Sequence, residues 1–410
     1  MIYLDHNATT PADPRALALV TALLAESGVG NPSSVHFAGQ RARAWLDRAR
    51  AAIALSAGLT PAKGETDRVI LTSGATEADH LGVIGAARWL RRAWHPDSAT
   101  PATSSAHSTP PGTIATLAID HPALLRPAAT LVAAGWRDCP LPYDAHGLLD
   151  VEAAVSALAT MPRPWLIAIA AVHHELGLIQ PLTTFAAALS SADARWAVGA
   201  DASRSGRGYR LHVDAAQASG RLPLPTLAGC ADQLVISGHK AGGIGGAGAL
   251  ILGHGVKIDA VIDGTQEKGL RGGTENLVGA VALGAAAERF AERCADHDAL
   301  RPLRDAAWRG IVAVWPQARR HADVEREHET GHVLSVMLPG IAAEAVVMAL
   351  DVAGICVSAG AACSSGTTQP SPAVAALAGD AVARSTVRIS LGPGQSRRDI
   401  DALVTAMGAI

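Results

Sequence analysis

The chain has 410 residues and a formal net charge of −3, and 49% of its residues are hydrophobic but only 3% are aromatic. This length allows two domains, and the low aromatic content predicts a core built from Ala, Leu, Val and Ile. The nearly balanced charge gives no electrostatic reason to expect a nucleic acid or an anionic membrane as partner. No apolar stretch approaches the ~20 residues of a membrane span, and residues 1–5 lack the basic start of a signal peptide, so we expect a cytoplasmic protein.

Hydrophobic periodicity and end signals predict alternating helices and strands along the chain. In chain order, we expect a short strand and turn over 2–10, helices over about 15–26 and 39–57, and a strand over 68–72 that leads into a helix. Strands over 114–119 and 166–172 follow, with further strands that end near 214 and 236. The last part should contain a helix over 277–299, a strand over 332–338, a helix near 343–352 and a strand over 386–391. The stretches 95–113 and 190–210 lack periodicity and are predicted to be loops.

The segment Ser73-Gly74-Ala75-Thr76-Glu77 joins a buried strand to the start of a helix. Free backbone N–H groups at a helix start, together with the helix dipole, make a good seat for a phosphate. The alternative is a plain capped helix, with Thr76 as the N-cap and Asp79 as its partner.

Two apolar strands are followed by histidines, Asp120-His121 in one case and His173-His174-Glu175 in the other. A histidine can exchange protons near neutral pH, so His121 is a candidate for proton transfer, with a helix-capping role as the alternative. The adjacent pair His173 and His174 raises the question of a metal. Neighbouring side chains of an extended segment point apart, however, so we expect no resident metal.

Lys240 and Asp214 each follow an apolar strand, within Ser237-Gly238-His239-Lys240 and His212-Val213-Asp214-Ala215-Ala216-Gln217. A lysine at the mouth of a buried strand is costly unless it finds a partner or loses its charge, and the neutral amine is a nucleophile. Such an amine can condense with a carbonyl cofactor, most commonly pyridoxal phosphate (PLP), whose ring nitrogen needs a carboxylate partner. A surface lysine in a Gly-rich turn is the alternative.

Five cysteines are scattered along the chain, at positions 139, 230, 294, 356 and 363. The absence of a C-x-x-C pair argues against a zinc or thioredoxin-type site, and the odd number argues against a disulfide framework. Cys363 is flanked by Gly, Ala and Ser in a long loop-like stretch, unlike a cysteine packed among large apolar residues. Composition alone leaves both a functional thiol and a structural cysteine open.

Taken together, YLDxxATT, GNPSSxH, SGATE, HVDAAQ, SGHK and the Cys363 segment resemble the PLP-dependent class V aminotransferases, and more narrowly their group I (NifS/IscS-like) cysteine desulfurases. The resemblance runs from residue 3 to about 392. It implies an α/β fold, the PLP-dependent transferase fold type I of aspartate aminotransferase. A large domain at 16–276 would hold a mainly parallel seven-stranded sheet, and residues 1–15 and 277–410 would form a smaller α+β domain.

The resemblance also implies roles for individual residues. Lys240, Cys363 and His121 would be catalytic, Arg388 and Asn7 would bind the substrate, and the PLP cofactor would contact Ala75, Thr76, His174, Asp214, Gln217, Ser237, His239, Lys240 and Thr274. Thr274 would reach the phosphate in the partner subunit of a homodimer. The family has Asn where this chain has His174, a larger group that can titrate.

The implied reaction removes sulfur from L-cysteine, giving L-alanine and a persulfide on Cys363. The persulfide would pass to an iron–sulfur scaffold or another acceptor, and Cys363 could transiently ligate a nascent iron–sulfur cluster. Selenocysteine lyase, class V aminotransferase and a catalytically impaired PLP-binding paralogue remain alternatives. His174 and the two predicted loops favour the last of these.

Overall fold

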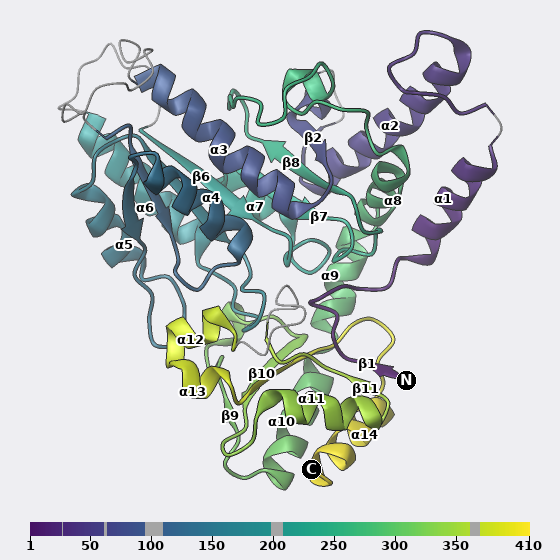
Figure 1. The fold of residues 1–410 in the computed structure, drawn as a ribbon, viewed down its shortest axis with the longest axis vertical. Helices are drawn as coiled ribbons and strands as arrows, with labels where there is room; N and C mark the ends of the chain where they lie inside the picture. Colours follow the sequence, from purple (N-terminus) through teal and green to yellow (C-terminus); the bar gives the residue numbers. More distant parts are fainter. Residues whose placement is uncertain (27, 61–63, 95–109, 198–207, 361–369) are drawn as a thin grey trace.

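The computed structural model describes residues 1–410 except 27, 61–63, 95–109, 198–207 and 361–369. Cys363 and most of the predicted loop at 95–113 therefore lie outside the described residues. Figure 1 shows a larger upper part built on a central sheet and a smaller lower part that contains both chain termini. None of the helices in the described ranges is both long and apolar enough to cross a membrane.

The central sheet has seven strands in the order β2-β8-β7-β6-β5-β3-β4, and only β8 runs antiparallel to its neighbours. The prediction of a mainly parallel seven-stranded sheet is confirmed. Its strands are β2 (Val69–Thr72), β3 (Thr113–Thr116), β4 (Arg137–Pro140), β5 (Trp165–Ala170), β6 (Tyr209–Asp214), β7 (Gln233–Ser237) and β8 (Gly248–Leu252).

Helices cover both faces of this sheet, as the uninterrupted apolar strands require. In β5, Trp165, Ile167 and Ile169 join one core cluster, while Leu166, Ala168 and Ala170 join another on the opposite face. The first cluster includes residues of α2 (Phe37–Ser56), α5 (Val151–Ala159), α6 (Leu182–Ala197), α7 (Leu224–Cys230) and α8 (Leu277–Ala287). The second includes residues of α3 (Ala75–Trp94) and α4 (Pro122–Ala133).

Two predicted boundaries were wrong. Helix α6 continues to Ala197, where a loop had been expected from residue 190. The helix expected over 277–299 is two helices, α8 and α9 (Phe290–Asp298). They separate at Arg289, whose φ of −110° and ψ of 8° leave the helical range, and its guanidinium pairs with Asp13 at 2.5 Å.

The smaller part has its own core, around the antiparallel sheet β12-β10-β9. Its strands are β9 (Arg319–Arg320), β10 (Val333–Met337) and β12 (Thr386–Ser390), and its helices are α10 (Arg301–Val314), α11 (Ala343–Val352) and α14 (Arg397–Gly408), with α12 (Pro372–Ala378) and α13 (Asp380–Ala383) nearer the central sheet. The N-terminal strand β1 (Ile2–Tyr3) pairs in parallel with β11 (Ile355–Cys356), and Leu4 is buried in the same core.

From there the N-terminal segment passes the central sheet on its way to α1 (Pro14–Ala25), which packs against α8. Helix α8 belongs to the core of the central sheet, although it begins beyond residue 276. The domain boundaries proposed from the sequence stay a prediction.

Candidate active site

A cavity of about 410 Å³ lies where several strands of the central sheet end. We call it the strand-end cavity. Most of the residues singled out from the sequence line it: Asn7, Ala75, Thr76, His121, His174, Asp214, Gln217, Ser237, His239, Lys240 and Arg388. They come together because parallel strands place their carboxyl ends at one edge of a sheet, where α/β proteins form their ligand sites.

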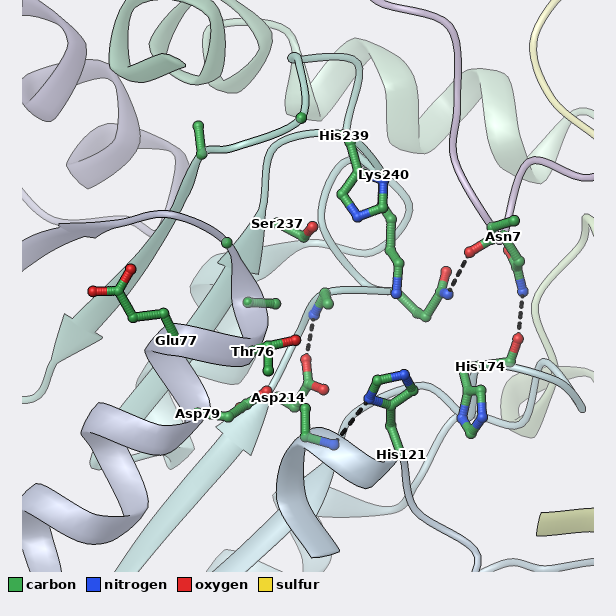
Figure 2. A pocket seen from close by; sticks show the side chains of 18 of the residues that line it. Asn7, Thr76, Glu77, Asp79, His121, His174, Asp214, Ser237, His239 and Lys240 are labelled. Carbon is green, nitrogen blue, oxygen red and sulfur yellow. Dashed lines mark hydrogen bonds between the residues drawn. The ribbon is translucent and has the colours of Figure 1, made fainter. Parts of the chain in front are cut away.

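Asp214 and Lys240 point into this cavity from the ends of the adjacent strands β6 and β7 (Figure 2). Asp214 is only 7% exposed, and its Oδ1 accepts a hydrogen bond of 2.7 Å from the backbone N–H of Ala216. Burial raises the pKa of Asp214, while this hydrogen bond and the charge of Lys240 act in the opposite direction. The cavity therefore joins an amine to a fixed carboxyl that is suited to a cationic partner.

A second acid, Asp79 of α3, also lines the cavity but is turned toward His212 of β6, with 3.0 Å between Asp79 Oδ1 and His212 Nε2. Burial raises the pKa of Asp79 well above its ordinary value and lowers that of His212 to about 4. Both directions fit a protonated Asp79 that donates to a neutral His212, whose Nδ1–H then donates to Gln233 Oε1 at 2.9 Å. The predicted pairing of Asp79 with Thr76 at a helix cap was wrong.

Helix α3 begins at Ala75, so Thr76 lies inside its first turn. Glu77 lies in the same turn and bonds back to the chain before the helix, since its Oε2 accepts a hydrogen bond of 2.6 Å from the backbone N–H of Ser73. Burial raises the pKa of Glu77, but its bonds to Arg271 and Ser73 outweigh this and leave the pKa below its ordinary value. The helix start thus presents backbone donors beside an acid that Arg271 already neutralises at 2.7 Å.

Ser237 and His239 complete the donors at this end of the cavity. Ser237 is 1% exposed, and Nδ1 of His239 lies 3.2 Å from Thr9 Oγ1. Burial, with smaller effects of Lys240 and Arg221, lowers the pKa of His239 to about 4. His239 is therefore a neutral donor or acceptor at physiological pH.

Three histidine rings meet on the opposite side. His121 and His174 are edge to face, with ring centroids 5.0 Å apart, and His173 stacks on His174 at 4.7 Å. The expectation that His173 and His174 point apart was wrong, because the chain turns at residues 174–176 rather than staying extended. His173 Nδ1 accepts from the backbone N–H groups of Glu175 and Leu176, each at 3.1 Å, which makes His173 a structural residue of that turn.

His121 has the helix-capping role that the sequence offered as an alternative, and its proton-transfer role stays a prediction. Its Nδ1 accepts from Ala123 N at 3.1 Å and caps α4, while its ring lines the cavity. Burial, His174 and Lys240 lower its pKa to about 3, so its ring is neutral. The described residues contain no group of three or more His, Cys, Asp or Glu side chains that could hold a metal.

His174 is anchored by an acid that the sequence did not single out. Its Nε2 lies 3.2 Å from Glu175 Oε1, which also accepts from Ser371 Oγ at 2.7 Å. Burial raises the pKa of Glu175, but the bonds to His174 and Ser371 outweigh it and hold the pKa at about 2. Glu175 is thus ionised and fixes the proton of His174 on Nε2, while Nδ1 has no partner among the described residues.

Arg388 and Asn7 lie side by side on the backbone oxygen of His174, which accepts from Arg388 Nη1 at 3.1 Å and from Asn7 Nδ2 at 3.0 Å. Arg388 Nη2 also donates to Asp5 Oδ1 at 2.7 Å. Asn7 Oδ1 accepts from Nε2 of His332 at 2.9 Å. Asp5 and His332 were not among the residues predicted from the sequence, although Asp5 lies in the YLDxxATT motif that pointed to Asn7.

Gln217 is held by the protein itself. Its Oε1 accepts from Arg221, and its Nε2 donates one of two hydrogens to Asn7 O at 3.0 Å. The second hydrogen is left for a ligand in the cavity.

Two residues named from the sequence are not part of this set. Thr274 is exposed and lines a neighbouring cavity of about 130 Å³, which shares Ser73, Gly246 and Ala247 with the strand-end cavity. Cys363 lies outside the described residues. The cysteines at 139, 230, 294 and 356 are described and free, and none of them lines the strand-end cavity.

Comparison with known proteins gives one consistent result. A family model described as aminotransferase class-V matches residues 2–403. The chain is 35% identical to a cysteine desulfurase of Cereibacter sphaeroides, over 100% of this chain and 95% of that protein. It is 31% identical to an IscS-like cysteine desulfurase of Mycobacterium tuberculosis, over 100% and 96%.

Solved structures agree with this. A NifS-like protein superposes with a TM-score of 0.81 at 25% identity, covering 100% of this chain and 98% of that one. A structure described as SspA in complex with cysteine superposes with a TM-score of 0.74 at 25% identity, covering 97% and 100%.

Proposed function

Because this chain belongs to the aminotransferase class-V family, among its NifS/IscS-like cysteine desulfurases, we propose that it uses PLP to remove sulfur from L-cysteine, leaving L-alanine and a persulfide on Cys363. The observation that carries the proposal is the meeting of Lys240 and Asp214 in one cavity at the carboxyl ends of adjacent strands. The neighbour bound to cysteine supports the choice of substrate.

The residues present fit PLP. A buried carboxyl, Asp214, suits a protonated ring nitrogen, and the backbone N–H groups around Ala75 and Thr76, with Ser237 and His239, suit a phosphate. The chemistry that PLP supplies when bound is electron withdrawal from the substrate's α-carbon. Lys240 would hold the cofactor, and we assign removal of the α-proton to its amine.

The neutral ring of His121 would lie against the cofactor and move protons near the substrate. Gln217 and His174 would hold the cofactor's phenolic oxygen. Gln217 Nε2 has one hydrogen to give, but His174 can donate from Nδ1 only as an imidazolium, because Glu175 fixes the other proton on Nε2.

Arg388 and Asn7 would bind the substrate's α-carboxylate. Their shared bonds to His174 O fix both side chains at the edge of the cavity, and Nε of Arg388 has no partner among the described residues. A guanidinium with a free N–H suits a carboxylate.

The Cys363 thiolate would attack the substrate sulfur, forming a sulfur–sulfur bond as the carbon–sulfur bond breaks. The four described cysteines support this assignment by their positions outside the cavity. Burial also raises the pKa values of Cys139, Cys230 and Cys294, the last to about 11, which makes them poor thiolates.

Thr274 would complete the phosphate site of a second subunit in a homodimer. Thr274 is exposed and lines a cavity that shares Ser73, Gly246 and Ala247 with the strand-end cavity. This position supports a contact between Thr274 and a second subunit. An iron–sulfur scaffold or another sulfur carrier would take the persulfide.

The test is sulfide and alanine release from L-cysteine in the presence of a thiol reductant. Cys363→Ala should keep the absorbance of bound cofactor and lose turnover, whereas Cys356→Ala should keep both. Full activity of Cys363→Ala on cysteine would rule out the persulfide step, and much faster turnover of selenocysteine than of cysteine would indicate a selenocysteine lyase. Turnover that requires a keto acid would indicate an aminotransferase, and cofactor binding without turnover an impaired paralogue.

A further inference from the structure

A second, larger cavity of about 550 Å³ lies beside α9 and shares no lining residue with the strand-end cavity. We call it the α9 cavity. Its walls come from the turn at 221–223, the C-terminal half of α9 and the segment 326–332 before β10. Helix α9 lies between the two parts of the molecule in Figure 1. This volume is typical of small-molecule sites.

Five polar side chains that line the α9 cavity have a buried atom with no hydrogen-bond partner among the described residues; one of them, Arg301 Nε, still lies 3.6 Å from Asp298 Oδ1, which leaves four without a charged partner. These four atoms are Arg221 Nε, His297 Nδ1, Thr330 Oγ1 and His332 Nδ1, and the residues are 5%, 3%, 5% and 1% exposed. Unpaired buried polar atoms are costly, and four of them in one cavity indicate a missing partner.

Arg221 is a buried cation without a counter-ion. Its Nη2 donates to His6 O at 2.9 Å and its Nη1 to the oxygens of Gln217, all of them neutral acceptors. No carboxylate is among the hydrogen-bond partners of Arg221 or the charges that shift its pKa, within the described part of the chain. Burial and the nearby Arg293 and Arg388 lower its pKa to about 9, so it stays charged at neutral pH and lacks an anion.

The imidazole of His332 supplies an acceptor instead of a donor. Asn7 Nδ2 donates to His174 O, so Asn7 Oδ1 must receive the Nε2–H of His332, and the Nδ1 of a neutral His332 carries a lone pair. Burial lowers the pKa values of His297, to about 2, and of His332, which keeps both rings neutral. The rings face each other with centroids 5.0 Å apart.

None of the carboxylates that line the α9 cavity is a counter-ion of Arg221. Glu329 is already paired with Arg301 at 3.1 Å and Arg304 at 2.8 Å. Asp298 and Glu327 are exposed at the mouth, with side chains 63% and 75% accessible. The described residues offer no metal-binding cluster here.

We propose that the α9 cavity binds a small free α-amino acid, with its carboxylate on Arg221 and Thr330 and its ammonium group on the ring nitrogens of His297 and His332. A zwitterion matches a set that joins the Arg221 cation and the Thr330 hydroxyl to the lone pair of His332 Nδ1, whereas a simple anion would leave that lone pair without a donor. His332 also donates to Asn7, which lines the strand-end cavity. A ligand in the α9 cavity would therefore contact a residue that positions Asn7. The inference does not depend on the proposed desulfurase activity.

Calorimetric titration of the holoenzyme with L-alanine tests this site. We expect Thr330→Val and His297→Leu to weaken binding of alanine in the α9 cavity at least tenfold. Neither variant should affect binding of alanine in the strand-end cavity, which Arg388→Lys should weaken. Propionate, which lacks the ammonium group, should bind the same site at least tenfold more weakly than alanine. Ser335→Ala is the matched control, since Ser335 Oγ is another buried, unpartnered hydroxyl but lines neither cavity.

The proposal is overturned if Thr330→Val and His297→Leu bind alanine like the parent protein, or if Arg388→Lys alone removes all binding. Circular dichroism and melting temperature establish that each variant is folded. Should a variant not fold, crystals of the parent protein soaked in L-alanine decide the question: density beside Arg221 supports the site, and an α9 cavity free of alanine at saturating concentration overturns it. Neither result depends on cysteine turnover, so failure of this site and failure of the proposed function are distinguishable.

Discussion

Arg388, the residue proposed to bind a substrate carboxylate, already holds a carboxylate of its own chain: its Nη2 lies 2.7 Å from Asp5 Oδ1. The Arg388 side chain is 3% exposed and that of Asp5 18%. Asp5 therefore both orients the guanidinium and neutralises part of the charge that would attract the substrate.

Asp5→Asn should separate these two effects, because the amide oxygen can still accept from Arg388 while the negative charge is gone. We expect the KM for L-cysteine to fall by about 2–5-fold, the range of ~0.5–1 kcal/mol typical of a partly exposed ion pair, with kcat little changed. Steady-state kinetics measures the KM for L-cysteine. Arg388→Lys is the comparison and should raise this KM. A higher KM in Asp5→Asn would mean that orientation outweighs charge.

The acid behind His174 should appear in the pH dependence of stability. The pKa of Glu175 is lowered from 4.5 to about 2, so its contribution is complete above pH 4.5 and is lost as the pH falls toward 2. The parent protein should therefore lose roughly 2–3 kcal/mol more stability than Glu175→Gln between pH 6 and pH 2.5. Urea titrations at several pH values measure this difference; parallel curves for the two proteins would contradict it.

The buried acids at the strand ends should differ in their sensitivity to an isosteric amide. Asp214 is proposed to act as a carboxylate, so Asp214→Asn should lower kcat/KM by roughly 100-fold or more and weaken cofactor binding. Burial raises the pKa of Asp120 well above its ordinary value, which favours the neutral acid, and Asp120→Asn should change kcat/KM less than about fivefold. Kinetics and cofactor absorbance of both variants provide the comparison, and equal effects would contradict it.

Close contact between α3 and β6 depends on Gly82. A Cβ on this residue would come within 2.5 Å of His212 Nδ1, a ring that is fully buried and bonded on both sides. Gly82→Ala should therefore cost roughly 2–4 kcal/mol of unfolding free energy, as overpacking of a tight core does. In α7, Gly229 has no heavy atom within 4 Å of the corresponding position, so Gly229→Ala should be neutral or slightly stabilising. Denaturant unfolding of the pair tests this, and equal stabilities would contradict it.

The sequence was sufficient for the parts of the site that depend on local pattern. An apolar run followed by a polar side chain located Asp214 and Lys240, and parallel strand direction then brought them to one edge. It was not sufficient where partners are distant in the chain, as for Asp5 with Arg388 or Asn7 with His332. Nothing local distinguishes Asp5 from any other acid that follows a strand.

Local backbone geometry limited other predictions. The stacked rings of His173 and His174 follow from a turn that ends at Gly177, whose φ is +71°, and the apolar pattern before it suggested a longer strand. Similarly, the apolar pattern of 277–299 continues through Arg289, although the ion pair with Asp13 accompanies a break in the helix there.

The N-terminal segment has a consequence for how the protein is made. Ile2 and Tyr3 pair with Ile355 and Cys356, Asp5 bridges to Ser390, and Asn7 lines the strand-end cavity. Residues 2–5 must therefore wait until residues 355–390 have been translated before they meet these neighbours. A nascent chain can assemble the central sheet early, but the strand-end cavity lacks a wall until Arg388 has been translated.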